Sequence, residues 1–250
     1  MNANIKLNAN LKPVIVFRFL AREGAGYLGD FLTTQNIPWL LQEIDLGKPL
    51  PVSILPYSGL VLMGGPMSVN DDLAWIAPIL ALIREAIDHD IPVLGHCLGG
   101  QLMSKALGAR ITQNITATGN KVKEIGWGAV NVSQNETAKH WFGKIDTFNA
   151  FHWHGETFSL PQGATHLLAS PFCQNQAWSI GKHLAFQTHI EMTIEMIQKW
   201  CEEGADELLE SADSLCVQQA NTMQENLPVH VFFLNKVAKQ IYSCWVKGLL

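Results

Sequence analysis

The stretch Pro92-Val-Leu-Gly-His-Cys-Leu-Gly-Gly-Gln101 decides how we interpret the fold of this chain. A short apolar run typical of a buried strand leads into Gly-x-Cys-x-Gly, centred on Cys97, and a helix is expected to follow as far as residue 107. This is the cysteine form of the sharp strand-to-helix turn that holds a nucleophile. Its glycines relieve steric crowding, and the first N–H groups of the helix favour a thiolate and can bind an oxyanion. The alternative, a buried structural cysteine, does not explain the three glycines.

The same alternation of strands and helices continues on both sides of this turn. Strands are predicted at residues 14–19, 39–44, 60–63, 92–95, 176–180 and 183–187, helices at residues 27–35 and 73–90, and mostly strands at residues 110–153. Residues 193–246 are predicted to be mostly helical, with a break near Asn226. The pattern predicts an α/β fold of the doubly wound, flavodoxin-like type, with a mostly parallel sheet, flanking helices and a C-terminal helical extension.

We divide the chain into three parts on this basis. Residues 1–12 are expected to be a flexible N-terminus, residues 13–200 one α/β domain, and residues 201–250 a helical extension. The extension carries apolar residues that need burial, either against the domain or in a homo-oligomer: Leu208, Leu209, Val231, Phe232, Phe233 and Leu234.

Composition excludes several classes of function. Apolar residues make up 48% of the chain and charged residues 16%, which allows a substantial core and argues against disorder. The net charge of -5, without a basic cluster, predicts no binding to nucleic acid or to an anionic membrane. The longest apolar run, residues 76–83, is interrupted by Pro78 and is too short to span a bilayer. Together with an N-terminus unlike a signal peptide, this predicts a soluble, cytoplasmic protein.

Two further motifs are expected at the same edge of the sheet as Cys97. Gly64-Gly65-Pro66 ends the predicted strand at residues 60–63, so its backbone amides could complete an oxyanion site. The same Gly-Gly-Pro turn is equally compatible with a strand end that has no catalytic role. His189-Ile190-Glu191 follows the strand at residues 183–187. There, His189 can act as a general base towards the thiol, with Glu191 orienting its imidazole.

Other patterns leave alternatives open. The glycine-rich turn at residues 24–29 could bind a phosphate, but no acidic residue stands where a dinucleotide site needs one, so we favour a simple tight turn. His152 and His154 share one face of a strand and could ligate zinc, but the sequence offers no third ligand at a suitable spacing. The five cysteines are scattered and never form a CxxC pair, which indicates neither disulfides nor a zinc knuckle. We therefore predict no metal and no cofactor.

The three ordered motifs resemble those of class I glutamine amidotransferases. The Gly64 turn, the Cys97 elbow and the His189 pair occur in the family's order. The stretch Trp153-His-Gly-Glu-Thr-Phe158, with Leu160-Pro161, is similar to a segment of the family's free-standing, GMP-synthase-like branch. The resemblance covers roughly residues 14–200.

The resemblance implies a Cys97-His189-Glu191 triad that hydrolyses the side-chain amide of glutamine through a γ-glutamyl thioester and releases ammonia. It also implies an oxyanion hole made by the N–H groups of Gly65 and Leu98. The matching substrate-binding positions are Gly64, Gln101 and His154, with a weaker correspondence for Glu156. The sequence departs from the commonest family pattern at His96, Gly100 and Thr188, which puts the identity of the substrate in doubt more than the chemistry.

Other functions remain open at this stage. A γ-glutamyl peptide hydrolase would share the fold and the thioester chemistry. A dienelactone-hydrolase-like esterase has a similar elbow, but it places its acid between the nucleophile and a late His, whereas Glu191 follows His189. A catalytically silent scaffold would not need all three triad residues. The chain has no motifs of an ATP-using synthetase, so any ammonia-accepting synthetase is expected to be a separate partner.

Overall fold

The structure is a computed structural model that describes residues 11–116, 119–212, 214 and 216–249. Residues 1–10, most of the predicted flexible N-terminus, lie outside the described part. The strands are β1 (Val14–Arg18), β2 (Trp39–Glu43), β3 (Gly59–Leu62), β4 (Val93–His96), β5 (Ile111–Gln113), β6 (Glu124–Val132), β7 (Thr147–His154), β8 (Glu156–Phe158), β9 (Thr165–Ala169), β10 (Ala177–Ile180) and β11 (His183–Phe186). The α-helices are α1 (Gly26–Thr34), α2 (Ile76–Asp88), α3 (Leu98–Ala106), α4 (Glu136–Phe142), α5 (Ile194–Glu203), α6 (Ala205–Glu210), α7 (Ala220–Gln224) and α8 (Leu227–Trp245).

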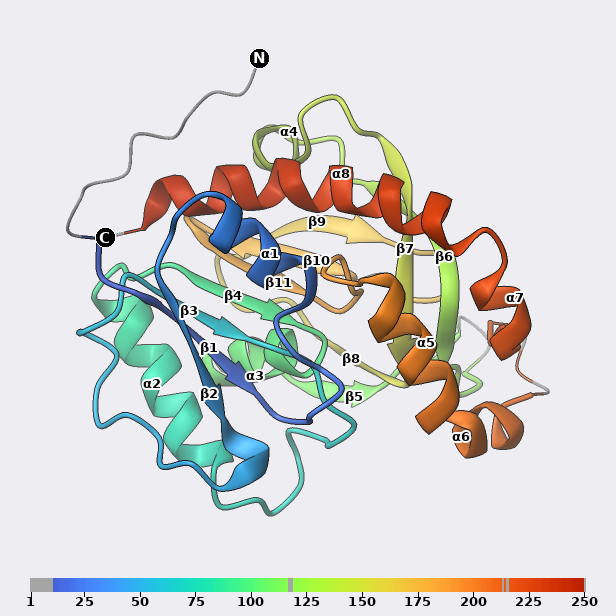
Figure 1. The fold of residues 1–250 in the computed structure, drawn as a ribbon, viewed down its shortest axis with the longest axis horizontal. Coiled ribbons are helices and arrows are strands. Elements are labelled where there is room, and N and C mark those ends of the chain that lie inside the picture. Colours follow the sequence, from blue (N-terminus) through green and yellow to red (C-terminus); the bar gives the residue numbers. More distant parts are fainter. Residues whose placement is uncertain (1–10, 117–118, 213, 215, 250) are drawn as a thin grey trace.

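A mixed sheet of nine strands forms the centre of the molecule, in the order β2-β1-β3-β4-β11-β10-β9-β6-β7 (Figure 1). The five strands from β2 to β11 run parallel, and the remaining pairings are antiparallel. The parallel part has the strand order of flavodoxin-like folds, in which ligands bind at the carboxyl ends of the strands. The predicted fold class is therefore confirmed.

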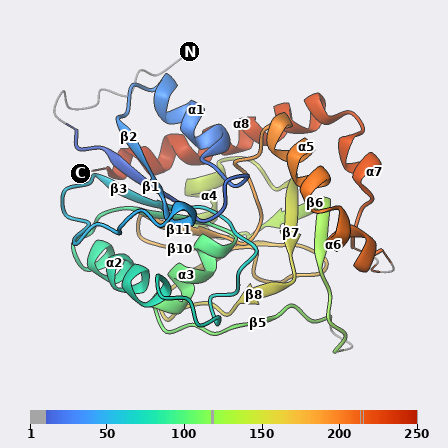
Figure 2. The same cartoon turned by 60° about the horizontal axis from the view of Figure 1, so that its bottom comes forward.

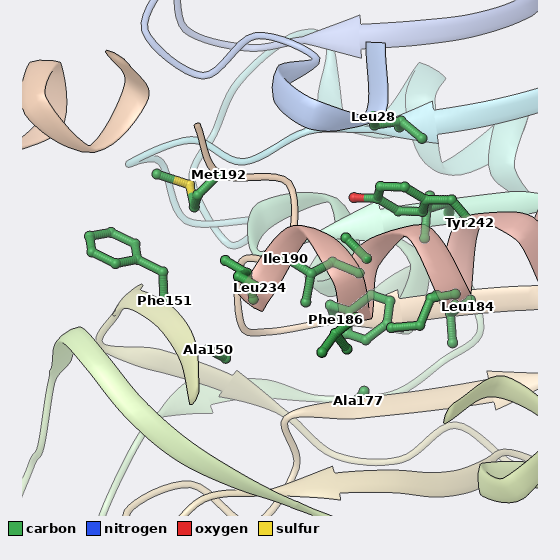
Figure 3. Close-up of a cluster of buried hydrophobic side chains, with 14 of the residues drawn as sticks. Leu28, Ala150, Phe151, Ala177, Leu184, Phe186, Ile190, Met192, Leu234 and Tyr242 are labelled. Atoms are coloured by element: carbon green, nitrogen blue, oxygen red, sulfur yellow. The ribbon is translucent and has the colours of Figure 1, made fainter. Parts of the chain in front are cut away.

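Helices cover both faces of this sheet (Figures 1 and 2), and each face buries its own hydrophobic core. Side chains of β1 alternate between the two cores: Val14 and Val16 belong to the core that includes α1, α4 and α8, whereas Ile15 and Phe17 belong to the core that includes α2 and α3. Figure 3 shows part of the first core, where Leu234 and Tyr242 of α8 pack near Phe186 and Ile190. Helix α8 thereby reaches the segment that carries the His189 motif.

The helices after residue 200 pack against the rest of the chain. Among the apolar residues singled out above, Leu208, Val231 and Leu234 are buried. Leu209, Phe232 and Phe233 remain exposed, and the ammonium group of Lys236 lies 4.2 Å from the centroid of the Phe232 ring. Burial against the domain thus accounts for one side of α8 only.

Within the described residues, no helix combines the length and the apolar character needed to cross a membrane.

Candidate active site

Parallel pairing brings the predicted site residues to one edge of the sheet. Strands β4 and β11 are neighbours, and Phe186 pairs with His96, so the segments that follow both strands emerge side by side. Strand β3 lies on the other side of β4 and leads into Gly64 and Gly65. Cys97, His189 and Gly65 accordingly line one pocket.

Cys97 occupies a strained turn between β4 and α3. Its φ of 49° and ψ of -109° are rare for a residue with a side chain. The turn is held in place because the N–H of Cys97 donates to the Phe186 carbonyl at 2.8 Å. Helix α3 can approach the sheet because Gly99 and Gly100 have no Cβ. A Cβ on Gly99 would lie 2.1 Å from the Leu62 carbonyl oxygen, and one on Gly100 would lie 2.4 Å from the Phe186 carbonyl oxygen. Cys97 is therefore held at the N-terminus of α3.

His189 and Glu191 form a buried hydrogen-bonded pair. Nδ1 of His189 lies 2.7 Å from Oε1 of Glu191, and both side chains are 1% exposed. Burial opposes protonation of the imidazole, but the negative charges of Glu191 and Cys97 outweigh it and raise the pKa of His189 well above its usual value. Burial likewise opposes ionisation of Glu191, yet the facing His96 and His189 hold the pKa of that carboxyl below its usual value.

The opposite nitrogen of His189 is available for proton transfer. Nε2 is buried and has no nitrogen or oxygen partner within the described part of the chain, while the Cys97 thiol lies near enough to the ring to contribute to its raised pKa. The ring is held by the indole of Trp200, which packs edge-on at 4.8 Å between centroids. The N–H of His189 donates to the Phe151 carbonyl at 2.8 Å. This fixed imidazole has one nitrogen engaged by Glu191 and the other free at the pocket that contains Cys97.

His96, the last residue of β4, makes a second contact to the carboxylate of Glu191 and links it to Tyr242 of α8. Nε2 of His96 lies 3.7 Å from Oε2 of Glu191 and 3.2 Å from the hydroxyl of Tyr242. Burial lowers the pKa of His96, which favours the neutral ring. The tautomer with the proton on Nε2 suits both neighbours, because it donates to the hydroxyl oxygen and turns a positive edge towards the carboxylate.

The predicted oxyanion donors lie close together. The N–H groups of Gly65 and Leu98 donate no hydrogen bond to any described residue. A Cβ on Gly65 would lie 2.8 Å from Cδ2 of Leu98, so the two segments are in contact. Two free N–H groups beside a nucleophile are the arrangement that stabilises a tetrahedral oxyanion.

Of the three predicted substrate-binding residues, Gln101 and His154 line the pocket, whereas Gly64 is buried behind it. Nε2 of Gln101 donates to Oε1 of Gln187 at 3.1 Å, and Nε2 of Gln187 lies 3.6 Å from the sulfur of Cys97. Gly64 lies next to the imidazole of His189.

His154 belongs to a buried polar network that the sequence did not reveal. Nε2 of His154 lies 3.2 Å from Oε2 of Glu124, and the ligand atoms of Glu124, His154 and Cys173 lie within 4.8 Å of one another. The amide nitrogen of Gln176 is placed among them, 2.7 Å from Glu124 and 3.4 Å from both His154 and His152. The candidate ligands that the structure groups are therefore Glu124, His154 and Cys173, and His152 of the predicted pair contacts the Gln176 amide instead.

Several further residues line the pocket without having been predicted. They come from the loop after β1, from the end of β7 and from the C-terminal helices: Arg22, Glu23, Trp153, Trp200 and Glu207. Apart from Trp153, which belongs to the segment Trp153–Phe158, no motif marks them, because each reaches the site only through the fold.

Comparison with known proteins identifies the family. The model of the class-I glutamine amidotransferase family matches residues 41–199, more than half of the chain. The chain belongs to the class I glutamine amidotransferase family. Its structure resembles that of a glutamine amidotransferase from Methylobacillus flagellatus, with a TM-score of 0.90, 42% identity and 96% of each chain covered.

Curated relatives of this chain carry names that state different activities. Gamma-glutamyl peptidase 3 of Arabidopsis thaliana is 26% identical over 189 residues, which are 72% of this chain and 74% of the peptidase. The glutamine-hydrolysing GMP synthase of Vibrio vulnificus is 28% identical over 159 residues, which are 62% of this chain but only 27% of the synthase.

Proposed function

We propose that this amidotransferase hydrolyses the γ-amide of glutamine or of a related γ-glutamyl compound through a thioester on Cys97. The observation that carries the proposal is the buried His189–Glu191 pair, whose free Nε2 lies at the pocket that holds the strained Cys97 turn. A nucleophile, a base and an orienting acid in this order are the components of covalent amide hydrolysis.

In the proposed reaction, the thiolate of Cys97 attacks the amide carbonyl, and the N–H groups of Gly65 and Leu98 bind the oxyanion. Nε2 of His189 donates a proton to the departing nitrogen, so that ammonia or an amine leaves and the thioester remains. The neutral imidazole then takes a proton from water, which attacks the thioester and releases the γ-carboxylate and the thiol. The charge of Glu191 stabilises the imidazolium in both halves of the cycle.

Two substrate classes fit this chemistry. In favour of glutamine stand the family itself and the GMP synthase relative. The Arabidopsis peptidase favours a γ-glutamyl peptide as the substrate. The chain covers 74% of the length of this peptidase but only 27% of the length of the synthase. For a role in ammonia transfer, we propose that the acceptor is a synthetase on another chain. We also propose that the exposed Phe232 and Phe233 provide a surface for self-association.

The experiment is to measure ammonia and glutamate release from L-glutamine, and amine release from γ-glutamyl dipeptides, with purified protein. Activity on either substrate class, dependent on Cys97, supports the proposal and decides between the classes. A folded protein inactive on both, alone and with an ammonia acceptor supplied, would favour the silent scaffold.

Tyr242→Phe tests the contact between α8 and the triad. The substitution keeps the ring packing and removes the hydroxyl beside His96, so we expect the free energy of unfolding to fall by about 1 kcal/mol. We also expect kcat/KM to fall by about threefold, because the orientation of His96 against Glu191 loosens. Thermal unfolding and steady-state kinetics measure both. The matched control is Tyr57→Phe, whose hydroxyl makes no hydrogen bond among the described residues; equal behaviour of the two variants would contradict the contact's role.

A further inference from the structure

Glu23 places a carboxylate in the pocket next to the reactive imidazole. It lies in the loop between β1 and α1, and its side chain is 6% exposed. A Cβ on Gly64 would lie 2.2 Å from Oε2 of Glu23 and 3.2 Å from Cε1 of His189. The carboxylate therefore sits directly over Gly64, beside the ring that is expected to transfer the proton.

This carboxylate has no partner of its own. Within the described residues it accepts no hydrogen bond and forms no ion pair. The neighbouring guanidinium of Arg22 is directed to Glu203, with Nη1 at 3.5 Å from Oε2. The other buried carboxylates among the described residues have hydrogen-bond partners: Glu124 accepts from Ser170 and Gln176, and Glu191 is paired with His189. An acid that is both buried and unpaired costs stability, which is expected where a ligand supplies the missing partner.

The electrostatics of the pocket agree with a cationic ligand. Burial raises the pKa of Glu23 to about 7, against the opposing effects of His189 and Arg22 and with smaller contributions from Glu191 and Glu207. A cation placed against this carboxylate would restore its ionised form and recover the free energy lost on burial.

We propose that Glu23 binds the α-ammonium group of the substrate and so restricts the site to γ-glutamyl compounds with a free α-amino group. This inference rests on the proposed function. A γ-glutamyl group carries its reacting carbonyl at one end of a short aliphatic stem and a zwitterionic α-carbon at the other. With the carbonyl at Cys97, the stem spans the pocket towards Gly64, where Glu23 meets the ammonium. Arg22, which lines the same pocket, offers the opposite charge to the α-carboxylate.

The test compares L-glutamine with its desamino analogue, glutaramic acid, on the wild type and on Glu23→Gln. We expect the wild type to prefer L-glutamine by about 100-fold in kcat/KM, because a buried charge-assisted contact is lost with the analogue. Glu23→Gln should lose most of this preference by a drop in kcat/KM for glutamine alone. The matched control is Glu207→Gln, whose oxygens already accept from Lys123 and Trp153 and which should affect both substrates alike.

The outcomes separate this inference from the proposed function. Equal hydrolysis of both amides by the wild type would overturn the role of Glu23 and leave the hydrolase intact. No hydrolysis of any γ-glutamyl amide would overturn the proposed function, and the inference would then be decided by binding alone. For that, calorimetry with Cys97→Ala should detect L-glutamine and a weaker glutaramic acid, and the double variant Cys97→Ala with Glu23→Gln should bind the two equally. Equal binding already in the single variant would overturn the inference.

Stability supplies a readout independent of any substrate. The pKa of Glu23 is raised by folding, so its unfavourable contribution is absent near pH 4.5 and complete above about pH 7. Glu23→Gln should therefore raise the melting temperature by about 5 °C at pH 8 and by far less at pH 5. A melting temperature that is unchanged or lowered at pH 8 would show that the carboxylate already has a partner in the free protein, against the inference.

Discussion

Cys97→Ala is expected to lower kcat for γ-glutamyl amide hydrolysis by at least about 10⁴-fold, because removing the nucleophile of a triad leaves only binding and oxyanion stabilisation. The substitution removes one sulfur from a side chain that is 6% exposed. It leaves the backbone of the turn, including the hydrogen bond from Cys97 to Phe186, in place. Substrate binding should therefore persist while turnover is lost.

The control is Cys244→Ala, a half-buried thiol on α8 that does not line the pocket. It should keep wild-type kcat. A Cys97→Ala protein that retained more than about a hundredth of the wild-type rate would be inconsistent with covalent catalysis at this position.

Glu191→Gln is expected to lower kcat by about 10³-fold with little change in KM, since the orienting acid acts mainly on the transition state. The amide keeps the size of the side chain but no longer stabilises an imidazolium. Because the charge of Glu191 raises the pKa of His189, its loss should lower that pKa. The alkaline limb of the pH–kcat/KM profile should accordingly move to lower pH.

Glu202→Gln is the matched control, because it changes an exposed carboxylate on α5. It should alter neither kcat nor the pH profile. If Glu191→Gln moved the alkaline limb upwards or left it in place, the imidazole would be oriented and charged by something other than this carboxylate.

Much of the fold follows from patterns that are local in sequence. The apolar runs and the glycine punctuation predicted β1, β2, β3, β4, β10 and β11 to within a residue or two, and their alternation with helices predicted the parallel order. The helix expected as far as residue 107 ends at Ala106 and is followed by Gly108, with a φ of 83° that glycine adopts freely. Cys97, Gly65 and His189 could be grouped in advance because parallel strands deliver their carboxyl ends to one edge.

The rest of the site depends on contacts between distant segments. Tyr242 touches His96 across 146 positions of sequence, and no periodicity on α8 distinguishes it from an ordinary core residue. Glu23 directly precedes the glycine-rich turn at residues 24–29, for which we favoured a simple tight turn over a phosphate site, and in that turn the N–H of Tyr27 donates to the Glu191 carbonyl at 2.8 Å. Glu124 of β6 reaches His154 because the two residues pair between β6 and β7. Cys173 reaches the same cluster because it follows β9, which also pairs with β6.

The exposed apolar residues of α8 are a further feature that the sequence alone does not determine. Helical spacing predicts that Phe232, Phe233 and Leu234 cannot all face one core, but it does not say which of them does. The structure buries Leu234 and leaves both phenylalanines exposed. Which side of α8 faces the core is decided by its packing against α1, α4 and β7.

The most direct measurement is peptide mapping by mass spectrometry after the protein reacts with an electrophilic glutamine analogue. A nucleophilic Cys97 in a γ-glutamyl site predicts a single adduct on the peptide that contains Cys97, formed in the wild type, suppressed by excess L-glutamine and absent from Cys97→Ala. An adduct distributed over Cys173, Cys201, Cys216 and Cys244, or no adduct on a folded protein, would contradict the assignment of Cys97 as the catalytic nucleophile.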